Sequence, residues 1–460
     1  MWFEKACEPV DPASLNFFRV AFGVLLLGEI VRYFAYGWIG DHYLKPELLF
    51  KYYGFEWVTP WPGYGLYVHF GTMGLFAAMI AVGFLYRLAA IGFLLCFAYV
   101  FLLEQANYLN HYYLVLSAAF ILCFVPAERG LSVDARLAQP LGPAMVPRWS
   151  IWALRLQFEV VLIYAGLMKI NADWLRGQPL GLWFAEQASL PLVGSWLQLP
   201  GMSVAAAWTV LLLHIAGALL LLRRRSRFAV FILYVGFHLA SSILFHIGLF
   251  PWLTLAGTLM FFDPDWPKQV WARLDGNKPA VARRAPVGSY VSRPGLLTYG
   301  GLGAFFVLQF LVPLRFLLYP GNVAWTGEGE WFAWRMKLDD KRAHARFIVS
   351  DPESGRRWEI DPGDHLRARQ VQMMATRPDM TVQFARHIET VWANREGVRD
   401  VDVPAVVKCS LNGRPAAPLI DPETDLTSVP RTLKHQTWIV PLTTALDVAS
   451  GRDKAPNPIY

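Results

Sequence analysis

The chain has 460 residues, of which 55% are hydrophobic and only 17% are charged. Soluble domains carry roughly a quarter of charged residues, so this composition excludes a wholly soluble enzyme and favours a membrane bundle with one modest soluble domain. The formal net charge of +7 does not indicate nucleic-acid binding, because the residues from Gly321 onward hold 19 Lys and Arg against 19 Asp and Glu. The basic surplus lies before that point, where membrane orientation accounts for it.

Nine apolar stretches are predicted to be membrane helices, for which about 20 residues suffice. The first contains Arg19, Glu29 and Arg32 and is not followed by a small-residue cleavage site, so we expect it to be retained. Together the nine spans predict an α-helical integral membrane bundle over residues 1–319. They cover residues 14–37, 66–85, 88–105, 112–126, 151–170, 203–222, 227–246, 247–262 and 295–317.

The basic residues in the loops predict how this bundle is inserted. With the N-terminus in the cytoplasm, the cytoplasmic segments hold 15 Lys and Arg, including four in the run Arg223 to Arg227. The opposite loops hold only Lys45, Lys51 and Arg176. Cytoplasmic loops carry an excess of Lys and Arg. Because nine is an odd number of spans, the chain after the last span is expected outside the cytoplasm.

Residues 320–460 are predicted to form a mixed α/β extracytoplasmic domain. ARFIVSDPESGRRWEI, residues 345–360, has the pattern of two strands around a Pro/Gly turn, and residues 406–420 have that of a hairpin around Asn412-Gly413. Between them, Ala368 to Asn394 has helical spacing interrupted at Pro378. The four cysteines have no spacing typical of a metal or redox site.

Isolated polar residues lie at the outer ends of several spans. Asn110 and His111, in NYLNHYYL, begin the fourth span, and Lys169 ends the fifth. His238 and His246 lie on the seventh, with His246 at its outer end. Ionisable groups that separate helices bring to one depth are typical of a buried polar site.

Each of these residues also has a structural interpretation. Lys169 can extend its amine to the lipid headgroups, and His238 can make an interhelical hydrogen bond. Arg155 and Glu159 are expected to form an ion pair within the fifth span. Metal binding by the three membrane histidines is disfavoured, because they form no i,i+4 pair and have no carboxylate beside them.

Several stretches, in order along nearly the whole chain, resemble the vitamin K-dependent γ-carboxylases, in a bacterial-type form with a horizontally transferred transmembrane domain. The strongest matches are DPASLNFFR (11–19), YVFLLEQANYLNHYYL (99–114), VPRWSIWALRLQ (146–157), AGLMKINADW (165–174) and FHLASSILFHIGLF (237–250). Weaker matches are WTGEGEWFAWRMK (325–337), LIDP (419–422) and TWIVPL (437–442).

The resemblance implies a membrane lyase that oxidises a reduced vitamin K, phylloquinol or menaquinol, to its epoxide with O2. The strong base formed on the way removes a γ-proton from a glutamate, which then captures CO2. Lys169 matches the family's catalytic base, His111 the histidine that supports it, and Asn110 precedes that histidine as in the family. No metal is expected to take part.

The resemblance also implies residues that bind the quinone. Phe250 and Met336 match positions expected to line its pocket, and Tyr108 stands for an aromatic next to the LNH motif. His246, at the same depth, is a fourth candidate. The expected partners are the lipid bilayer, the quinone and a peptide or protein glutamate, with no nucleic acid.

The sequence departs from the animal enzymes of the family. It has no counterpart of their disulfide between the two domains, and it ends soon after TWIVPL, so the acceptor of CO2 is open. These departures favour a bacterial inner-membrane protein with its N-terminus in the cytoplasm. A transporter, or a non-catalytic membrane chaperone or maturation factor of the same fold, stays an alternative, although no repeated halves typical of transporters are present.

Overall fold

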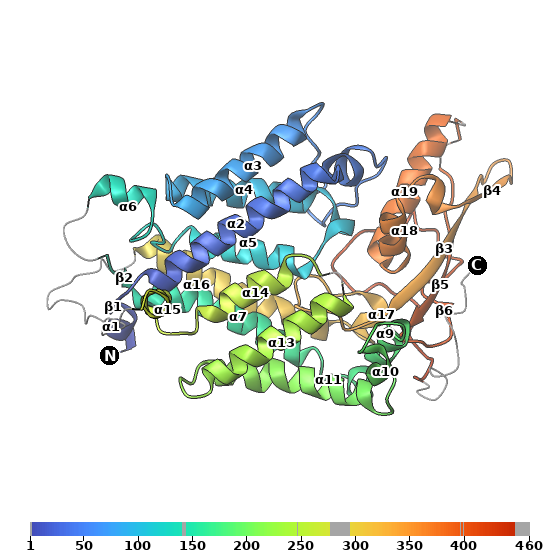
Figure 1. Cartoon of the computed structure of the whole chain (residues 1–460). Coiled ribbons are helices and arrows are strands. Elements are labelled where there is room, and N and C mark those ends of the chain that lie inside the picture. The colour runs from blue at the N-terminus through green and yellow to red at the C-terminus, as the bar shows by residue number, and fades with distance from the viewer. Residues whose placement is uncertain are drawn as a thin grey trace.

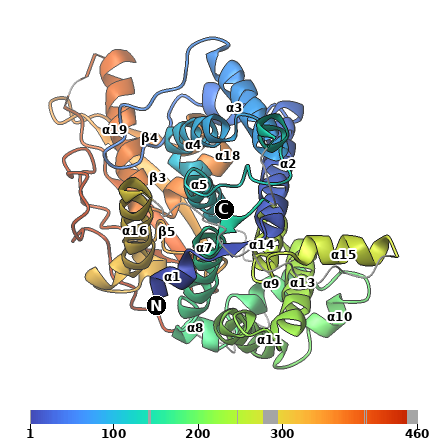
Figure 2. The ribbon, with the colours of Figure 1, turned by 90° about the vertical axis from the view of Figure 1, so that its left-hand side faces the viewer.

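The computed structural model describes residues 2–139, 144–245, 247–276, 295–395, 397–398 and 400–446. Long helices run side by side along one direction, and a smaller domain of strands and helices covers one end of them (Figure 1). The N-terminus lies at the other end (Figure 1). A view along the bundle from that end shows α7 near the middle, with other helices around it (Figure 2).

Seven helices among the described residues are long and apolar enough to cross a membrane. They correspond to seven of the nine predicted spans. The fifth predicted span, residues 151–170, is α7, which ends earlier than expected, at Leu167. The seven are α2 (Ala13–Ala35), α3 (Gly65–Val82), α4 (Tyr86–Leu103), α7 (Arg148–Leu167), α11 (Met202–Leu212) continued by η3 (Leu213–Gly217) and α12 (Ala218–Leu221), α13 (Arg227–Leu244), and α16 (Leu296–Leu311) continued by η4 (Val312–Leu318).

The other two predicted spans are short helices. The fourth is α5 (Asn110–Leu122), of 13 residues, and the eighth is α14 (Phe250–Leu259), of 10 residues. At 1.5 Å per residue they are about 20 and 15 Å long, less than the ~30 Å thickness of the hydrocarbon core. Both are packed inside the bundle, α5 against α4 and α7, and α14 against α2, α7 and α13. They are half-helices whose N-terminal ends lie within the protein.

Shorter elements connect these helices. Near the N-terminus, β1 pairs with β2 in an antiparallel two-stranded sheet. The connecting elements are α1 (Trp2–Ala6), β1 (Pro9–Val10), η1 (Gly40–Leu44), η2 (Gln105–Asn107), α6 (Val133–Ala138), β2 (Val146–Pro147), α8 (Ala172–Leu175), α9 (Leu180–Glu186), α10 (Gly194–Leu197), α15 (Trp266–Leu274) and α17 (Val323–Thr326).

One buried cation and one glycine hold the first two spans together. Arg19 on α2 donates to the carbonyl oxygens of Ile80 and Ala81, at 2.7 and 3.0 Å, and so satisfies the last carbonyls of α3. A Cβ on Gly23 would lie 2.6 Å from the Ala77 oxygen. The two helices therefore approach more closely than a side chain at this position would permit.

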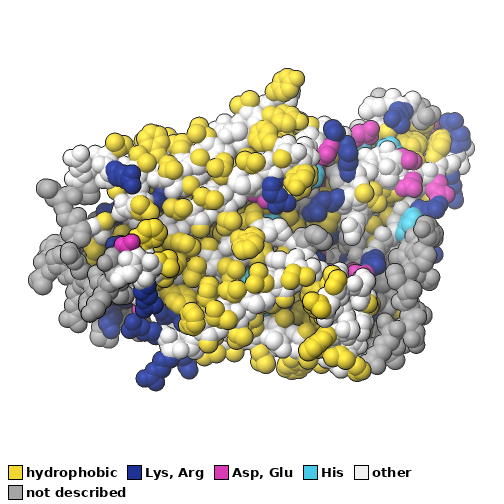
Figure 3. Space-filling model, viewed as in Figure 1, with side chains coloured by type: hydrophobic (Ala, Val, Ile, Leu, Met, Phe, Trp, Pro, Cys, Tyr) yellow, Lys and Arg dark blue, Asp and Glu magenta, His cyan; other side chains and the backbone are white. Residues whose placement is uncertain are grey.

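The surface of the bundle is apolar along its length, and charged side chains gather towards the two ends (Figure 3). Exposed aromatic residues near these ends include Trp57, Trp61 and Tyr64 in the loop before α3 and Trp271 on α15. Trp and Tyr are enriched at the two interfaces of a membrane with water. This distribution fits a bundle that spans a bilayer.

The domain at the end of the bundle has the predicted mixed α/β structure. Its antiparallel sheet has the order β4-β3-β5-β6. Asn412 and Gly413, with φ of 53° and 80°, turn the chain between β5 and β6 in the left-handed region that Asn and Gly tolerate best. The elements are β3 (Lys341–Ser350), β4 (Arg357–Ile360), η5 (Pro362–Asp364), α18 (Ala368–Ala375), α19 (Pro378–Arg395), β5 (Ala405–Leu411) and β6 (Ala417–Pro418).

The two parts of the molecule share their hydrophobic cores. Phe50 and Ala106, from loops of the bundle, are fully buried in the core of the α/β domain. In the opposite direction, Trp334 and Leu338 from the segment before β3 belong to the core of the bundle. All four cysteines are free. Packing and polar contacts, rather than a disulfide, therefore hold the domain on the bundle.

The predicted ion pair between Arg155 and Glu159 is wrong. Arg155 instead donates to the carbonyl oxygens of Met260 and Phe262, at 2.6 and 2.7 Å. Both carboxyl oxygens of Glu159 are buried without a hydrogen-bond partner among the described residues. Met260 and Phe262 lie just after α14, where carbonyl groups have no partners within the helix, so they compete successfully for the guanidinium.

Candidate functional site

A cavity of about 780 Å³ lies between the bundle and the α/β domain. The N-terminal ends of the half-helices α5 and α14 both reach it, through Asn110 and His111 and through Phe250. Its other walls come from α2, η1, η2, α9, α11, η3, α13, α18, the segment after α7 and the segment before β3. Its volume is in the range typical of sites for small molecules.

Lys169 lies in this cavity, two residues after the end of α7. Its side chain is buried, with 3% of the residue exposed, and Nζ donates to the Ala165 carbonyl oxygen at 2.8 Å. The amine also lies 5.0 Å from the centre of the Trp174 ring. The amine is therefore turned inwards, and it does not extend to the headgroups. Burial lowers the pKa of Lys169 to about 7, and the positive charge of Arg335 adds to this effect.

His111 and Asn110 line the same cavity as Lys169. The His111 ring lies 4.7 Å from the Tyr112 ring and 6.3 Å from the Phe250 ring, measured between centroids. Asn110 is held on both sides of its amide: Nδ2 donates to the Arg335 carbonyl oxygen at 3.0 Å, and Oδ1 accepts from Tyr108 Oη at 3.1 Å. Asn110 thereby joins the start of α5 to the segment before β3.

Two of the predicted quinone-binding residues, Phe250 and Met336, line the cavity. Tyr108 lies behind its wall, where its hydroxyl accepts a hydrogen bond from the backbone N–H of Phe332 at 3.1 Å. His246 is outside the described residues. Thus Asn110, His111, Lys169, Phe250 and Met336 meet in one cavity, although they come from four separate segments of the chain.

The segment that supplies Met336 has an unusual backbone. Phe332, Trp334 and Lys337 have positive φ angles of 59°, 55° and 50°. Such conformations are costly for residues other than glycine, and they persist only where the surroundings hold them. The Trp334 ring stacks on Tyr113 with centroids 4.6 Å apart, which fixes the segment against α5.

Two buried histidines in the cavity were not predicted as site residues. His214 lies in η3, a π-helical turn, and its Nδ1 is 2.7 Å from the Val210 carbonyl oxygen. The interhelical hydrogen bond predicted for His238 is absent: both ring nitrogens are buried without a partner among the described residues. A buried unpaired polar group is costly. His238 therefore offers a hydrogen bond to whatever fills the cavity.

Besides Lys169, four charged residues in the described part of the chain line the cavity. Arg32, Lys337 and Arg369 bring three cations, and Glu29 brings one carboxylate, which pairs with Arg32 at 2.7 Å. The Lys337 amine lies 4.9 Å from the centre of the Phe245 ring. The remaining wall is largely aromatic and aliphatic, so the cavity combines a few cationic side chains with a mainly apolar wall.

A buried ion pair anchors the segment that carries Lys169 to the α/β domain. Arg414 donates to both carboxyl oxygens of Asp173, at 2.6 and 2.8 Å, and Asn412 Nδ2 donates to the same carboxylate at 2.8 Å. Asp173 follows Lys169 by one turn, and Arg414 and Asn412 belong to the turn after β5. A bidentate contact fixes orientation as well as distance.

These features define a multi-span membrane protein that encloses a lysine-containing cavity under an α/β domain. The family model of the HTTM domain matches residues 7–266, and that of the vitamin K-dependent gamma-carboxylase lumenal domain matches residues 296–445. The chain therefore belongs to the vitamin K-dependent gamma-carboxylase family. No solved structure matches the chain.

Proposed function

We propose that this protein is a quinol-oxidising enzyme of the bacterial inner membrane, which converts a reduced vitamin K or menaquinol to its epoxide with O2 and couples this reaction to CO2-dependent carboxylation of a glutamate. The observation that carries the proposal is Lys169, a buried amine whose pKa is lowered to about 7, in a largely apolar cavity. A lysine in water, with a pKa of about 10.4, is protonated and cannot serve as a base.

In this proposal Lys169 takes the proton from a quinol hydroxyl. Within the residues that the structure describes, the amine has one hydrogen bond, to the Ala165 carbonyl oxygen, so its lone pair is free when it is neutral. No hydrogen bond joins Lys169 to His111 among the described residues. In this proposal His111 acts as a neighbour of the base in the same cavity wall, without contacting it directly. His238, whose two ring nitrogens have no partner within the described ranges, supplies a donor for a quinol oxygen.

The half-helices α5 and α14 favour the deprotonated quinol. Both N-terminal ends reach the cavity, and the aligned peptide dipoles of a helix give its N-terminus a partial positive charge. Transporters use broken helices in the same way to bind anions at membrane depth. Here these ends would stabilise the negative charge that forms when Lys169 removes the proton.

The cationic side chains of the cavity wall support the second half of the reaction. Arg32, Lys337 and Arg369 lie in the wall of the same cavity as Lys169. Guanidinium and ammonium groups bind carboxylates through charge-assisted hydrogen bonds. An acidic peptide or protein segment is the substrate that fits these cations. Its glutamate would then lie beside the quinone.

The test is a reaction with purified protein in lipid nanodiscs, in air, with reduced vitamin K or menaquinol. We expect the epoxide by mass spectrometry and, with a glutamate-containing peptide and labelled bicarbonate, the label in the peptide. Lys169→Arg keeps a cation but is no base near neutral pH, and it should reduce epoxide formation by at least ~10²-fold, the lower range for loss of a general base.

Lys337→Met is the matched control, because it removes a lysine from the same cavity outside the proposed proton transfer. It should retain epoxide formation and weaken peptide carboxylation. Absence of epoxide from the unaltered protein with either quinol, or near-normal turnover of Lys169→Arg, would overturn the proposal. Epoxide without peptide label would restrict the function to quinol oxidation.

A further inference from the structure

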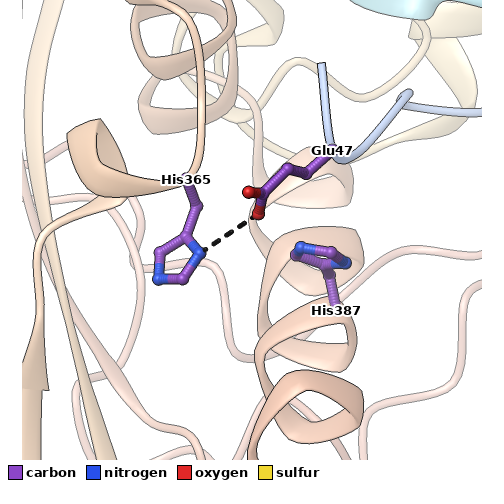
Figure 4. Close-up of side chains that lie close together, drawn as sticks. All are labelled: Glu47, His365 and His387. Atoms are coloured by element: carbon purple, nitrogen blue, oxygen red, sulfur yellow. Dashed lines mark ion pairs between the residues drawn. The ribbon is translucent and has the colours of Figure 1, made fainter. Parts of the chain in front are cut away.

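Three side chains outside the cavity converge at the contact between the bundle and the α/β domain. Glu47 belongs to the loop after η1, His365 follows η5, and His387 lies on α19. One potential ligand atom from each lies within 4.8 Å of the other two. Figure 4 shows both imidazole rings beside the Glu47 carboxylate, which comes from a different part of the chain.

These groups make one long ion-pair contact, between His365 and Glu47 (dashed line in Figure 4), and leave a histidine nitrogen without a partner in the part of the chain that the structure describes. His365 Nδ1 is 3.6 Å from the nearer Glu47 oxygen, which is too long for a hydrogen bond. His387 Nε2 is buried and has no hydrogen-bond partner among the described residues. An unpaired buried nitrogen carries a desolvation cost. A metal ion bound between the three side chains would accept the electron pair of this nitrogen and so remove the desolvation cost.

The spacing suits a divalent transition metal. Zinc bonds of about 2.0–2.1 Å in tetrahedral geometry place the ligand atoms about 3.4 Å apart. The 3.6 Å separation is already near that value. The other pairs of ligand atoms lie within 4.8 Å of one another and would close on a metal by side-chain movement, for which Glu47, 59% exposed, has room. Two imidazoles and one carboxylate form a ligand set that zinc uses with water in the fourth position.

We propose that Glu47, His365 and His387 bind a divalent transition-metal ion, with zinc as the expected occupant. The ion would connect a loop of the bundle to two elements of the α/β domain. Phe50, three residues after Glu47, is already buried in the core of that domain. Metal binding would thus strengthen the packed contact between the bundle and the α/β domain. No disulfide does so, because the four cysteines are all free.

The site adjoins the cavity along both chain segments. His42, five residues before Glu47, and Arg369, four residues after His365, both line the cavity. A metal that fixes Glu47 to His365 would therefore hold two parts of the cavity wall in register. The inference does not depend on the proposed quinol chemistry, since the ligands lie outside the cavity lining.

The experiment is metal titration of the purified full chain in nanodiscs after chelation. We expect about one Zn²⁺ per chain, an increase of the thermal midpoint on zinc addition, and with Co²⁺ the intense visible absorption of a tetrahedral site. Loss of an outer-shell partner alone weakens metal binding by about 10–100-fold. Glu47→Gln and His387→Ala should each weaken zinc binding by at least about tenfold.

Glu47→Gln changes an exposed side chain, so its fold should be retained even if His387→Ala unfolds. His344→Ala is the matched control, because His344 lies on β3 of the same domain outside the cluster. It should bind zinc as the unaltered chain does. Absence of stoichiometric zinc binding, or zinc affinity unchanged by Glu47→Gln and by a folded His387→Ala, would overturn the proposal.

Discussion

Lys169 shows how its surroundings decide the role of a single side chain. At the end of an apolar helix, a lysine can reach water or stay in the protein. Here Trp174 lies beside the amine and the Ala165 carbonyl accepts its hydrogen bond. Both contacts direct the side chain into the cavity. The same burial that excludes water also favours the neutral amine.

The lowered pKa of Lys169 predicts how the reaction depends on pH. Only the neutral amine accepts a proton, so kcat/KM for quinol oxidation should rise as pH increases through about 7 and level off above it. The measurement is kcat/KM for the reduced quinone between about pH 5.5 and 9, the range that brackets this value. A flat profile across that range would argue against Lys169 as the base.

His238 offers a test that separates a ligand-binding role from a structural one. Because both ring nitrogens lack partners in the described part of the chain, His238→Leu should leave the thermal midpoint unchanged or higher. It should raise KM for the quinol by about tenfold, the value of one hydrogen bond of ~1.4 kcal/mol. The two readouts are KM for the quinol, measured from the dependence of the rate on quinol concentration, and thermal unfolding of the same sample.

His214 is the matched control for that variant. Its Nδ1 lies within hydrogen-bonding distance of the Val210 carbonyl oxygen, so His214→Leu should lower the thermal midpoint. If His238→Leu destabilised the protein as much as His214→Leu and left KM unchanged, His238 would be a structural residue.

At the scale of elements, sequence periodicity predicted most of the fold. The strands β3, β4 and β5 and the helices α18 and α19 follow the alternation and the breaks at Pro378 and Asn412-Gly413. Hydropathy also located α5 and α14, but it could not show that they are half-helices. Their length depends on where the chain packs inside the bundle, and an apolar run has the same hydropathy in lipid and in protein.

The site was predictable where local motifs carry it and not where distant contacts do. Asn110, His111 and Lys169 lie in recognisable motifs, and the structure brings them to one cavity. The spacing of Glu47, His365 and His387 in the sequence does not predict a metal site, because these residues meet only after the two domains pack. Arg155 was misassigned, because the free carbonyls of a neighbouring helix cannot be seen from its own sequence.

The ion pair between Asp173 and Arg414 is an element-scale contact with a measurable energy. Arg414→Met leaves a buried carboxylate without its main partner, which should lower the free energy of unfolding by about 3–5 kcal/mol. Asp173→Asn combined with Arg414→Met removes both charges and should cost much less than the sum of the single changes. Unfolding in nanodiscs, followed by Trp fluorescence, gives the double-mutant cycle; additive effects would contradict a coupled pair.

At the scale of the whole molecule, the two ends of the bundle differ. The N-terminus lies at one end and the α/β domain at the other (Figure 1). Exposed aromatic residues lie near each end, with Trp57 and Trp61 before α3 and Trp271 on α15. A bilayer that covers the apolar surface between them would leave the two ends on opposite sides of the membrane.

The excess of Lys and Arg in the loops at the N-terminal end predicts which side is which. The N-terminus should be cytoplasmic and the α/β domain extracytoplasmic. A reporter that is active only outside the cytoplasm, fused after Tyr460, should give full activity in cells. The same reporter fused after Arg225 in the basic run before α13 serves as the control and should be inactive. The reverse pattern would invert the topology.

The ion pair between Asp173 and Arg414 also imposes an order on biosynthesis. The ribosome makes the segment with Lys169 early and the turn with Arg414 late, and the membrane lies between the cytoplasm and the predicted site of that turn. The helices can therefore insert before the residue that anchors Lys169 has been exported. In a newly inserted bundle the segment with Lys169 would lack this anchor, and under the proposed function the protein would gain activity only when its last domain folds over the cavity.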